Sequence, residues 1–493
     1  MSQTTNPSAT AHRDRRWLIL AVIGIAQLLV VLDVTIVNIA LPSAQRELHF
    51  SDDDRQWVIT AYALAFGGLL LLGGRIADMF GRKWTFIGGL LGFAGASALG
   101  GAAQSFGVLV GARALQGAFA AMLAPAALSL LTTTFTDPAE RNKAFGIYAG
   151  IAGMGGAIGL LLGGALTEAL DWRWCLYVSI LFAVPAAITG SRLLHHTAVR
   201  SRPRLDLPGT LTASSGLFAL VYGLSHGESG GWGDAVTVGF LIGSAVLLAA
   251  FVALERRVAH PLLPLRVVAD RARGGSFLAI GTASAGIFGV LLFLTFYLQN
   301  TKGLTALESG LAFLPMSFSI APTVALTSTL LLPRTGPRPL VPTGMLIAAL
   351  GMALLTRIGI DTAYATHVLP SLVLIGVGFG LILGASFPTA TAGVPAHDSG
   401  VASAMVSTSQ QIGGSIGTAL LSTLAVSATT GFVTDHGSAP EVLRQATVEG
   451  YTTAFWFAAA IFAAGALVTG ALLRSDARPA PSHAAPEPAP AHS

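Results

Sequence analysis

The chain has 493 residues and a formal net charge of +4, with 53% hydrophobic and only 11% charged residues. A soluble domain carries roughly 25% charged residues, so this composition excludes an ordinary soluble globular enzyme. The basic residues lie in short loops between apolar runs rather than in a patch interleaved with aromatic residues, which argues against a nucleic-acid partner.

Apolar stretches of about 20 residues, each bounded by charges, prolines or glycine turns, predict fourteen membrane-spanning helices. The first is long enough to cross a hydrocarbon core of ~30 Å, so it is predicted to be a membrane helix rather than a signal peptide. In chain order the predicted spans are 17–41, 56–74, 84–103, 106–131, 143–168, 174–194, 208–226, 235–254, 275–298, 307–332, 339–356, 367–391, 400–427 and 450–473. They predict an all-α polytopic membrane protein.

The distribution of basic residues orients these spans. If the N-terminus is inside, 21 of the 28 Lys and Arg residues fall in the inside segments and six in the outside loops, while Arg113 lies within a span. Because Lys and Arg concentrate on the cytoplasmic side of membrane proteins, both termini are predicted to be cytoplasmic.

Internal repetition divides the chain into two halves. The sequence "GGAIGLLL" at 155–162 recurs as "GGSIGTAL" at 413–420, and "GRIADMFGRK" has a degenerate copy, "RTGPRP", later in the chain. Parallel repeats around a site at the membrane midplane are a common transporter design. The predicted organisation is a cytoplasmic segment 1–16, a six-helix bundle 17–194, a linker with two inserted helices 195–273, a second six-helix bundle 274–473, and a disordered cytoplasmic tail 474–493.

Two charged residues, Asp33 and Arg113, lie well inside the predicted spans. At a rise of ~1.5 Å per residue both lie in the outer half of the membrane, at similar depth, so they either meet or share a water-filled cavity. Asp33 is either a proton-coupling group or the acceptor of a structural hydrogen bond. Arg113 is either functional or part of a salt bridge that packs the helices. Neutral polar residues within spans, each of which also fits an interhelical hydrogen bond, are candidates for a substrate cavity: Gln27, Asn38, Gln116, Gln410 and Gln411.

The chain shows no signature of a bound cofactor. Its single cysteine, Cys175, excludes a thiolate metal cluster. A nucleotide-binding loop of the form GxxxxGK[ST] is also absent from the sequence. We therefore expect neither a metal nor another cofactor.

Several motifs together resemble one family, the fourteen-helix drug:proton antiporters of the major facilitator superfamily. The resemblance covers about 15–473 and is carried by "LDVTIVNIALP" at 32–42, "GGRIADMFGRK" at 73–83, "RALQGAFAA" at 113–121, "GGAIGLLLGG" at 155–164, "DWRWCLYVSI" at 171–180 and "GVASAMVSTSQQIGGSIGTA" at 400–419. It implies the major facilitator fold, with two six-helix bundles plus two inserted helices.

The resemblance also implies roles for particular residues. Asp33 and Arg113 match the positions associated with proton coupling. A gate loop between the second and third helices would comprise Gly74, Asp78, Gly81, Arg82 and Lys83. In that loop the glycines permit a tight turn, and Asp78 can accept hydrogen bonds at a helix N-terminus.

The fifth helix carries the antiporter motif of this family. Its matching residues are Gly155, Gly159, Gly163 and Gly164. The motif usually has proline after its glycine, where this chain has Gly156 and Leu160, so we expect this helix to be less kinked.

The implied function is a proton-driven antiporter that exports amphipathic small molecules by alternating access. The alternative is a proton-coupled importer or facilitator of a small metabolite. A membrane-embedded enzyme is disfavoured, because a lone Asp and a lone Arg supply neither a nucleophile with its base nor a metal cluster. The expected partners are the substrate, protons and the lipid bilayer of a bacterial cytoplasmic membrane, with the monomer as the functional unit.

Overall fold

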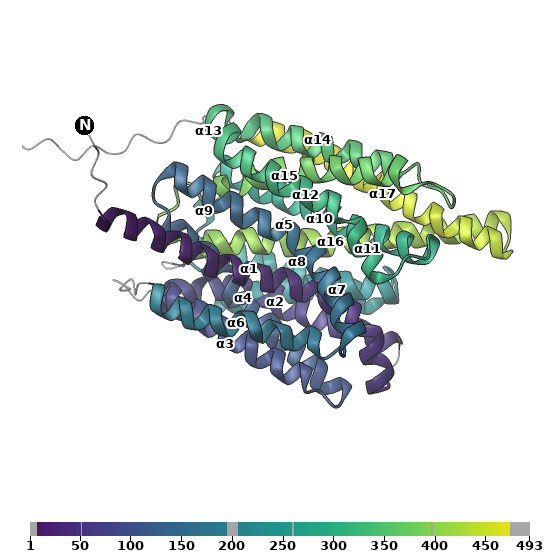
Figure 1. Cartoon of the computed structure of the whole chain (residues 1–493), viewed down its shortest axis with the longest axis horizontal. Helices are drawn as coiled ribbons and strands as arrows, with labels where there is room; N and C mark the ends of the chain where they lie inside the picture. Colours follow the sequence, from purple (N-terminus) through teal and green to yellow (C-terminus); the bar gives the residue numbers. More distant parts are fainter. Residues whose placement is uncertain (1–6, 51, 195–205, 259–260, 396–397, 474–493) are drawn as a thin grey trace, which may run out of the picture.

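The structure is a computed structural model that describes residues 7–50, 52–194, 206–258, 261–395 and 398–473. The predicted tail 474–493 and the first six residues of the predicted N-terminal segment lie outside this range. Figure 1 shows an elongated bundle of roughly parallel and antiparallel helices. The first eight helices are α1 (Pro7–Leu48), α2 (Asp52–Phe80), α3 (Arg82–Gly101), α4 (Phe106–Thr134), α5 (Pro138–Ala169), α6 (Trp174–Leu193), α7 (Leu207–Gly230) and α8 (Ala235–Glu255).

The second half of the chain is more broken, with three short π-helical segments. Its elements are α9 (Leu265–Ala269), α10 (Arg271–Phe296), η1 (Tyr297–Thr301), α11 (Ala306–Ala312), α12 (Leu314–Leu326), η2 (Thr327–Leu331), α13 (Leu332–Thr335), α14 (Pro337–Leu355), η3 (Tyr364–Val368), α15 (Leu369–Thr391), α16 (Ser399–His436) and α17 (Pro440–Leu472).

The membrane-spanning segments agree with the sequence prediction. Within the described residues, 13 helical segments are long and apolar enough to cross a membrane, and the bent helix α5 makes 14. The predicted all-α polytopic fold is therefore confirmed.

Helix α5 differs from expectation in its shape. Its axis turns by 45° between Pro138–Gly156 and Leu161–Ala169. The missing proline had predicted a less kinked helix, yet α5 is clearly bent without it. Gly155, Gly156 and Gly159 cluster at the bend, and a run of glycines loosens a helix enough to bend it.

Short polar side chains begin several of the helices. Asp137 accepts hydrogen bonds from the backbone N–H groups of Ala139 and Glu140 at the start of α5. Asp206, Asp234 and Asp270 cap α7, α8 and α10 in the same way. Such caps satisfy backbone donors that have no partner inside the helix.

The two repeated glycine stretches pack in equivalent ways. Side chains and backbone of α1 occupy the space beside Gly155, Gly159 and Gly163 of α5. The backbone of α10 occupies the space beside Gly413 and Gly417 of α16. Each stretch therefore lies against the first helix of its own half, as an internal duplication requires.

The two halves meet closely at one end of the bundle, which we call the linker end because α9 lies there (left side of Figure 1). Ser129 of α4 and Ser399 of α16 are hydrogen bonded with their oxygens 2.9 Å apart. Gly146 of α5 lies directly against Ser328 of η2. Two separate contacts, α4 with α16 and α5 with η2, thus hold the halves together at the linker end.

At the opposite end, α5 of the first half packs against α11 of the second half. Gly164 of α5 lies near Leu307 of α11, where an added Cβ would be 3.8 Å from the Leu307 nitrogen. Among the described residues, α1 and α10 make at most isolated contacts with each other. The conformation is therefore asymmetric, with the tight seam at the linker end.

Candidate functional site

The centre of the candidate site is a buried ion pair between α1 and α4. Arg113 Nη1 lies 2.6 Å from Asp33 Oδ2, and the side chains of Arg113 and Asp33 are 2% and 0% exposed. The two residues that sequence analysis placed at similar depth therefore meet directly. A charged pair this deeply buried is retained only where its partners satisfy it well.

Gln116 completes the pair from one turn further along α4. It accepts a hydrogen bond from Arg113 Nη1 at 2.9 Å and donates from Nε2 to Asp33 Oδ1 at 3.0 Å. Its Nε2 also donates to Ser97 Oγ of α3 at 2.8 Å. Each oxygen of Asp33 thus accepts one hydrogen bond, and Gln116, which is fully buried, belongs to this network.

Helix α2 contributes two further contacts to Arg113. Arg113 Nε donates to the Val58 carbonyl oxygen at 3.2 Å. The Tyr62 ring lies under the guanidinium, with Arg113 Cζ 4.5 Å from the ring centroid. Sequence analysis did not predict these contacts or the one made by Ser97. A sequence does not distinguish a Val, Tyr or Ser that only packs within a span from one that contacts a functional residue.

The opposite charges of Asp33 and Arg113 hold this arrangement together. A proton on Asp33 would remove the charge that Arg113 faces and leave a buried guanidinium without its counterion. A state that separates the two residues, or that admits water, is stabilised relative to the present one when Asp33 is neutral. The geometry can therefore couple the uptake of one proton to a rearrangement of α1 and α4.

The predicted gate-loop residues gather at the linker end. Gly81 adopts a φ of 94°, which favours glycine, between α2 and α3. Gly74 faces α16 so closely that an added Cβ would lie 2.7 Å from Ala404 Cβ and 2.8 Å from the Gly400 carbonyl oxygen. These two glycines therefore allow the turn and the close approach of the halves.

Asp78 bridges the two halves at this end. Its Oδ1 accepts a hydrogen bond from the backbone N–H of Gly400 at 3.3 Å, in the first turn of α16. Arg82 Nη2 lies 3.8 Å from the same oxygen. Lys83 donates to the carbonyl oxygen of Ser191 of α6 at 2.7 Å, so it ties the turn to its own half.

The antiporter-motif glycines lie between α5 and its neighbours. Gly155 faces Val31, Gly159 faces Thr35 and Gly163 faces Ile36, all on α1. Gly164 instead faces Leu307 of α11. Three of the four glycines therefore let α5 approach the helix that carries Asp33.

The remaining candidate cavity residues are dispersed. Gln27 is buried and accepts a short hydrogen bond of 2.5 Å from the Tyr148 hydroxyl of α5. Gln410 and Gln411 on α16 are partly exposed, and Gln411 lies against Gly67 of α2. The side chain of Asn38 lies outside what the structure describes.

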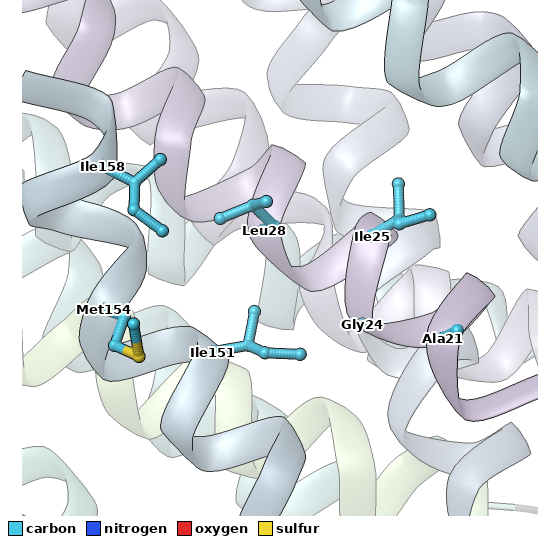
Figure 2. A pocket seen from close by; sticks show the side chains of 7 residues that line it. All are labelled: Ala21, Gly24, Ile25, Leu28, Ile151, Met154 and Ile158. Carbon is cyan, nitrogen blue, oxygen red and sulfur yellow. The ribbon is translucent and has the colours of Figure 1, made fainter. Parts of the chain in front are cut away.

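An apolar cavity of about 210 Å³ lies between α1 and α5 (Figure 2). Its lining residues are Ala21, Gly24, Ile25, Leu28, Ile151, Met154 and Ile158. In Figure 2, Ile151 and Ile158 extend from α5 toward α1, and Leu28 extends from α1 toward α5. Drug-sized ligands occupy roughly 300–1,000 Å³, so this cavity has room for part of such a molecule only.

A second polar cluster, which sequence analysis missed, ties α1 to the start of α6 at the end opposite the linker. Glu47 Oε1 lies 2.8 Å from Arg173 Nη2, and the indole nitrogen of Trp172 donates to Glu47 Oε2 at 2.6 Å. The hydrogen bond from Arg173, aided by that from Trp172, holds the pKa of Glu47 below its usual range. Glu47 is therefore charged at neutral pH and ties the end of α1 that lies opposite the linker end to the start of α6.

The comparisons agree on one family. The family described as Major Facilitator Superfamily matches residues 23–418. Puromycin resistance protein pur8 of Streptomyces alboniger is 53% identical over 464 residues, which cover 94% of this chain and 92% of that protein. Cephamycin export protein CmcT of Amycolatopsis lactamdurans is 39% identical over 411 residues, which cover 82% of this chain and 84% of that protein.

A solved structure supports the same fold. The crystal structure of the human organic anion transporter MFSD10 matches with a TM-score of 0.63, covering 92% of this chain and 99% of that one. Its 14% identity shows likeness of fold alone. The resemblance found in the sequence motifs is thereby confirmed, as is the expectation that the chain is not an enzyme. The chain belongs to the major facilitator superfamily, as a multi-pass membrane transporter whose relatives are antibiotic resistance and export proteins.

Proposed function

We propose that the protein is a proton-driven antiporter that exports amphipathic small molecules, with Asp33 as its proton carrier and Arg113 as the partner that responds to the proton. The observation that carries this proposal is the buried Asp33–Arg113 ion pair, whose nitrogen and oxygen lie 2.6 Å apart. On a fold that works by alternating access, such a pair gives a proton control over the conformational equilibrium.

The orientation follows from the charge distribution. The linker end faces the cytoplasm, both termini are cytoplasmic, and the closed linker end makes the present conformation an outward-facing one. The chain works as two six-helix bundles, 17–194 and 274–473, with 195–273 as the linker that carries the inserted helices. One monomer contains the complete Asp33 network, and so we propose the monomer as the functional unit.

The substrate class follows from the available charges. Within the described spans Asp33 is already paired with Arg113, so little negative charge remains for a ligand. A dication in an apolar cavity needs compensating carboxylates. The substrates are therefore neutral, zwitterionic or monocationic. Glu308, the acid nearest to the outer end of the α11–α12 span, instead caps α11 by accepting a hydrogen bond from the Thr305 backbone N–H at 2.8 Å.

The test of this function is efflux in cells that lack their own exporters. Puromycin is the first compound to test because of the 53% identical relative, beside matched monovalent and divalent lipophilic cations. We expect resistance to puromycin and to monocations, weak resistance to dications, and loss of efflux with a protonophore. Efflux that persists without a proton gradient would contradict the proposal, and proton-coupled uptake instead of efflux would favour the importer alternative.

A second experiment tests the gate. Gly74→Ala places a Cβ against α16, so it destabilises the state that is closed at the linker end. We expect turnover to fall by roughly tenfold, equivalent to about 1.4 kcal/mol, with substrate affinity little changed. Transport by purified protein in proteoliposomes measures turnover, and equilibrium binding measures affinity.

Gly88→Ala is the matched control for the gate experiment. Gly88 is exposed on α3 and an added Cβ there meets no atom within 4 Å. It should leave turnover unchanged. A large loss of affinity in Gly74→Ala at unchanged turnover would place Gly74 in the binding site rather than in a gate.

A further inference from the structure

Two buried carboxyl groups face each other where the inserted helices meet the linker. Asp206 caps α7 and is 6% exposed, while Glu255 ends α8 and is 5% exposed. Asp206 Oδ2 and Glu255 Oε1 both lie within 2.7 Å of the place that a Cβ on Gly209 would occupy. The carboxyl oxygens therefore lie within about 5 Å of each other.

The outer oxygen of Asp206 lacks a donor. Asp206 Oδ1 accepts the backbone N–H of Gly209 at 3.0 Å, whereas Oδ2 is buried and accepts nothing from any described group. Two carboxylates this close repel each other, so the binding of one proton stabilises the pair. A proton shared between Asp206 Oδ2 and Glu255 Oε1 satisfies both.

Among the described residues, no cationic side chain pairs with Asp206 or Glu255 and so takes the place of the shared proton. The charged groups on the elements around the pair are Arg256 and Arg257 at the end of α8, Arg75 and Asp78 on α2, Asp398 before α16, and Arg266 on α9. Arg256 and Arg257 are exposed, and Arg266 pairs with Asp398. Arg75 and Arg82 both lie near Asp78. None of the ion pairs described for these residues involves Asp206 or Glu255.

Glu255 also anchors the linker. Its two oxygens accept the backbone N–H groups of Leu262 and Leu263 at 3.1 and 3.0 Å. These leucines pack with Leu71 of α2 and Val401 of α16, which belong to opposite halves. We call residues 262–266 the strap, because it lies over the seam between the halves.

The other end of the strap is fixed at the gate. Arg266 Nη2 donates to Asp398 Oδ2 at 2.6 Å. Asp398 lies two residues before Gly400, whose backbone N–H donates to Asp78. The strap thus runs from the carboxyl pair to the residues that close the linker end.

We propose that Asp206 and Glu255 form a second proton-binding site, in which one shared proton keeps the strap anchored over the closed linker end. When the proton leaves to bulk water, the two charges repel, Glu255 withdraws from Leu262 and Leu263, and the linker end opens more easily. If the linker end faces the cytoplasm, as the proposed function has it, this water is cytoplasmic; the rest of the inference does not depend on the proposed function.

The experiment measures opening of the linker end as a function of pH. Spin labels at Trp84→Cys on α3 and Thr335→Cys on α13 report the distance between the halves, because both positions are exposed at the linker end. The native Cys175 is buried and can stay in place. The parent protein for these experiments carries Asp33→Asn, so that the central site cannot titrate, and every further variant is made in this parent.

Asp206→Asn is the informative variant. Its amide oxygen still accepts the Gly209 N–H, and its NH₂ group donates permanently to Glu255 Oε1 in place of the shared proton. In the parent we expect the closed fraction to fall over about two pH units as pH rises, as for a single proton site. In Asp206→Asn the closed fraction should stay higher than in the parent at high pH, with only the pH dependence that the buried carboxyl of Asp78 supplies in both proteins.

Two further variants complete the design. Glu255→Gln can accept from only one of the two leucine amides, so the closed fraction should be lower at every pH. Glu140→Gln is the matched control, since Glu140 is also a linker-end acid but pairs with Arg16 inside the first half. It should follow the parent.

Infrared difference spectra of the parent protein give a direct readout. We expect a protonated-carboxyl band that disappears as pH rises and that is missing in Asp206→Asn and in Glu255→Gln. A parent-like pH profile in Asp206→Asn, or a titrating band that is as large in both variants as in the parent, would overturn the proposal. Because the readouts need neither substrate nor a proton gradient, they succeed or fail independently of the proposed transport function.

Discussion

Asp33→Asn is expected to abolish proton-driven efflux while leaving a folded protein in the membrane. Asparagine keeps the shape and can still accept from Arg113, but it cannot exchange a proton. In the proposed transport cycle Asp33 is neutral in one state, and a rearrangement of α1 and α4 then relieves the buried Arg113, so we expect Asp33→Asn to fold in that state. Efflux from proteoliposomes under an imposed pH gradient should fall to the level of empty liposomes.

A second measurement separates coupling from movement. Exchange of labelled for unlabelled substrate needs no net proton transfer, so Asp33→Asn should retain it. Asp33→Glu, which keeps a titratable carboxyl on a longer side chain, should recover part of the proton-driven efflux. Wild-type efflux in Asp33→Asn would show that another group carries the proton.

Much of the fold was predictable because a membrane imposes strong rules on sequence. A span needs about 20 apolar residues, and loop charges are asymmetric, so the fourteen spans can be read without a structure. The depth of Asp33 and Arg113 also follows, since each helix rises steadily from its end. Their contact was one of two open alternatives, and the structure selects the direct ion pair.

Other features depend on packing that no sequence pattern specifies. The stacking of Tyr62 under Arg113 requires α2 to lie at a particular rotation beside α4. The bend of α5 occurs at glycines, where the absence of proline had suggested a straighter helix. The pairing of Asp206 with Glu255 joins residues about 50 positions apart, both of which read as ordinary loop charges.

Arg113→Gln is expected to cost much more stability than Arg113→Gln combined with Asp33→Asn. The single change leaves Asp33 buried with only Gln116 as a donor, and removing one partner of a buried ion pair costs about 3–5 kcal/mol. The double variant has no buried charge left at this site. Thermal unfolding of the purified proteins should therefore show a marked drop for the single change and recovery of most of it in the double variant.

Transport by the double variant then decides what the ion pair is for. If Asp33 and Arg113 only pack α1 against α4, then a variant that restores stability with two neutral side chains restores proton-driven efflux as well. If the pair couples the proton to the conformational change, then stability returns and efflux does not, because neither residue can change charge. We expect the second outcome. Efflux near the wild-type level in the stable double variant would show that the pair only packs α1 against α4.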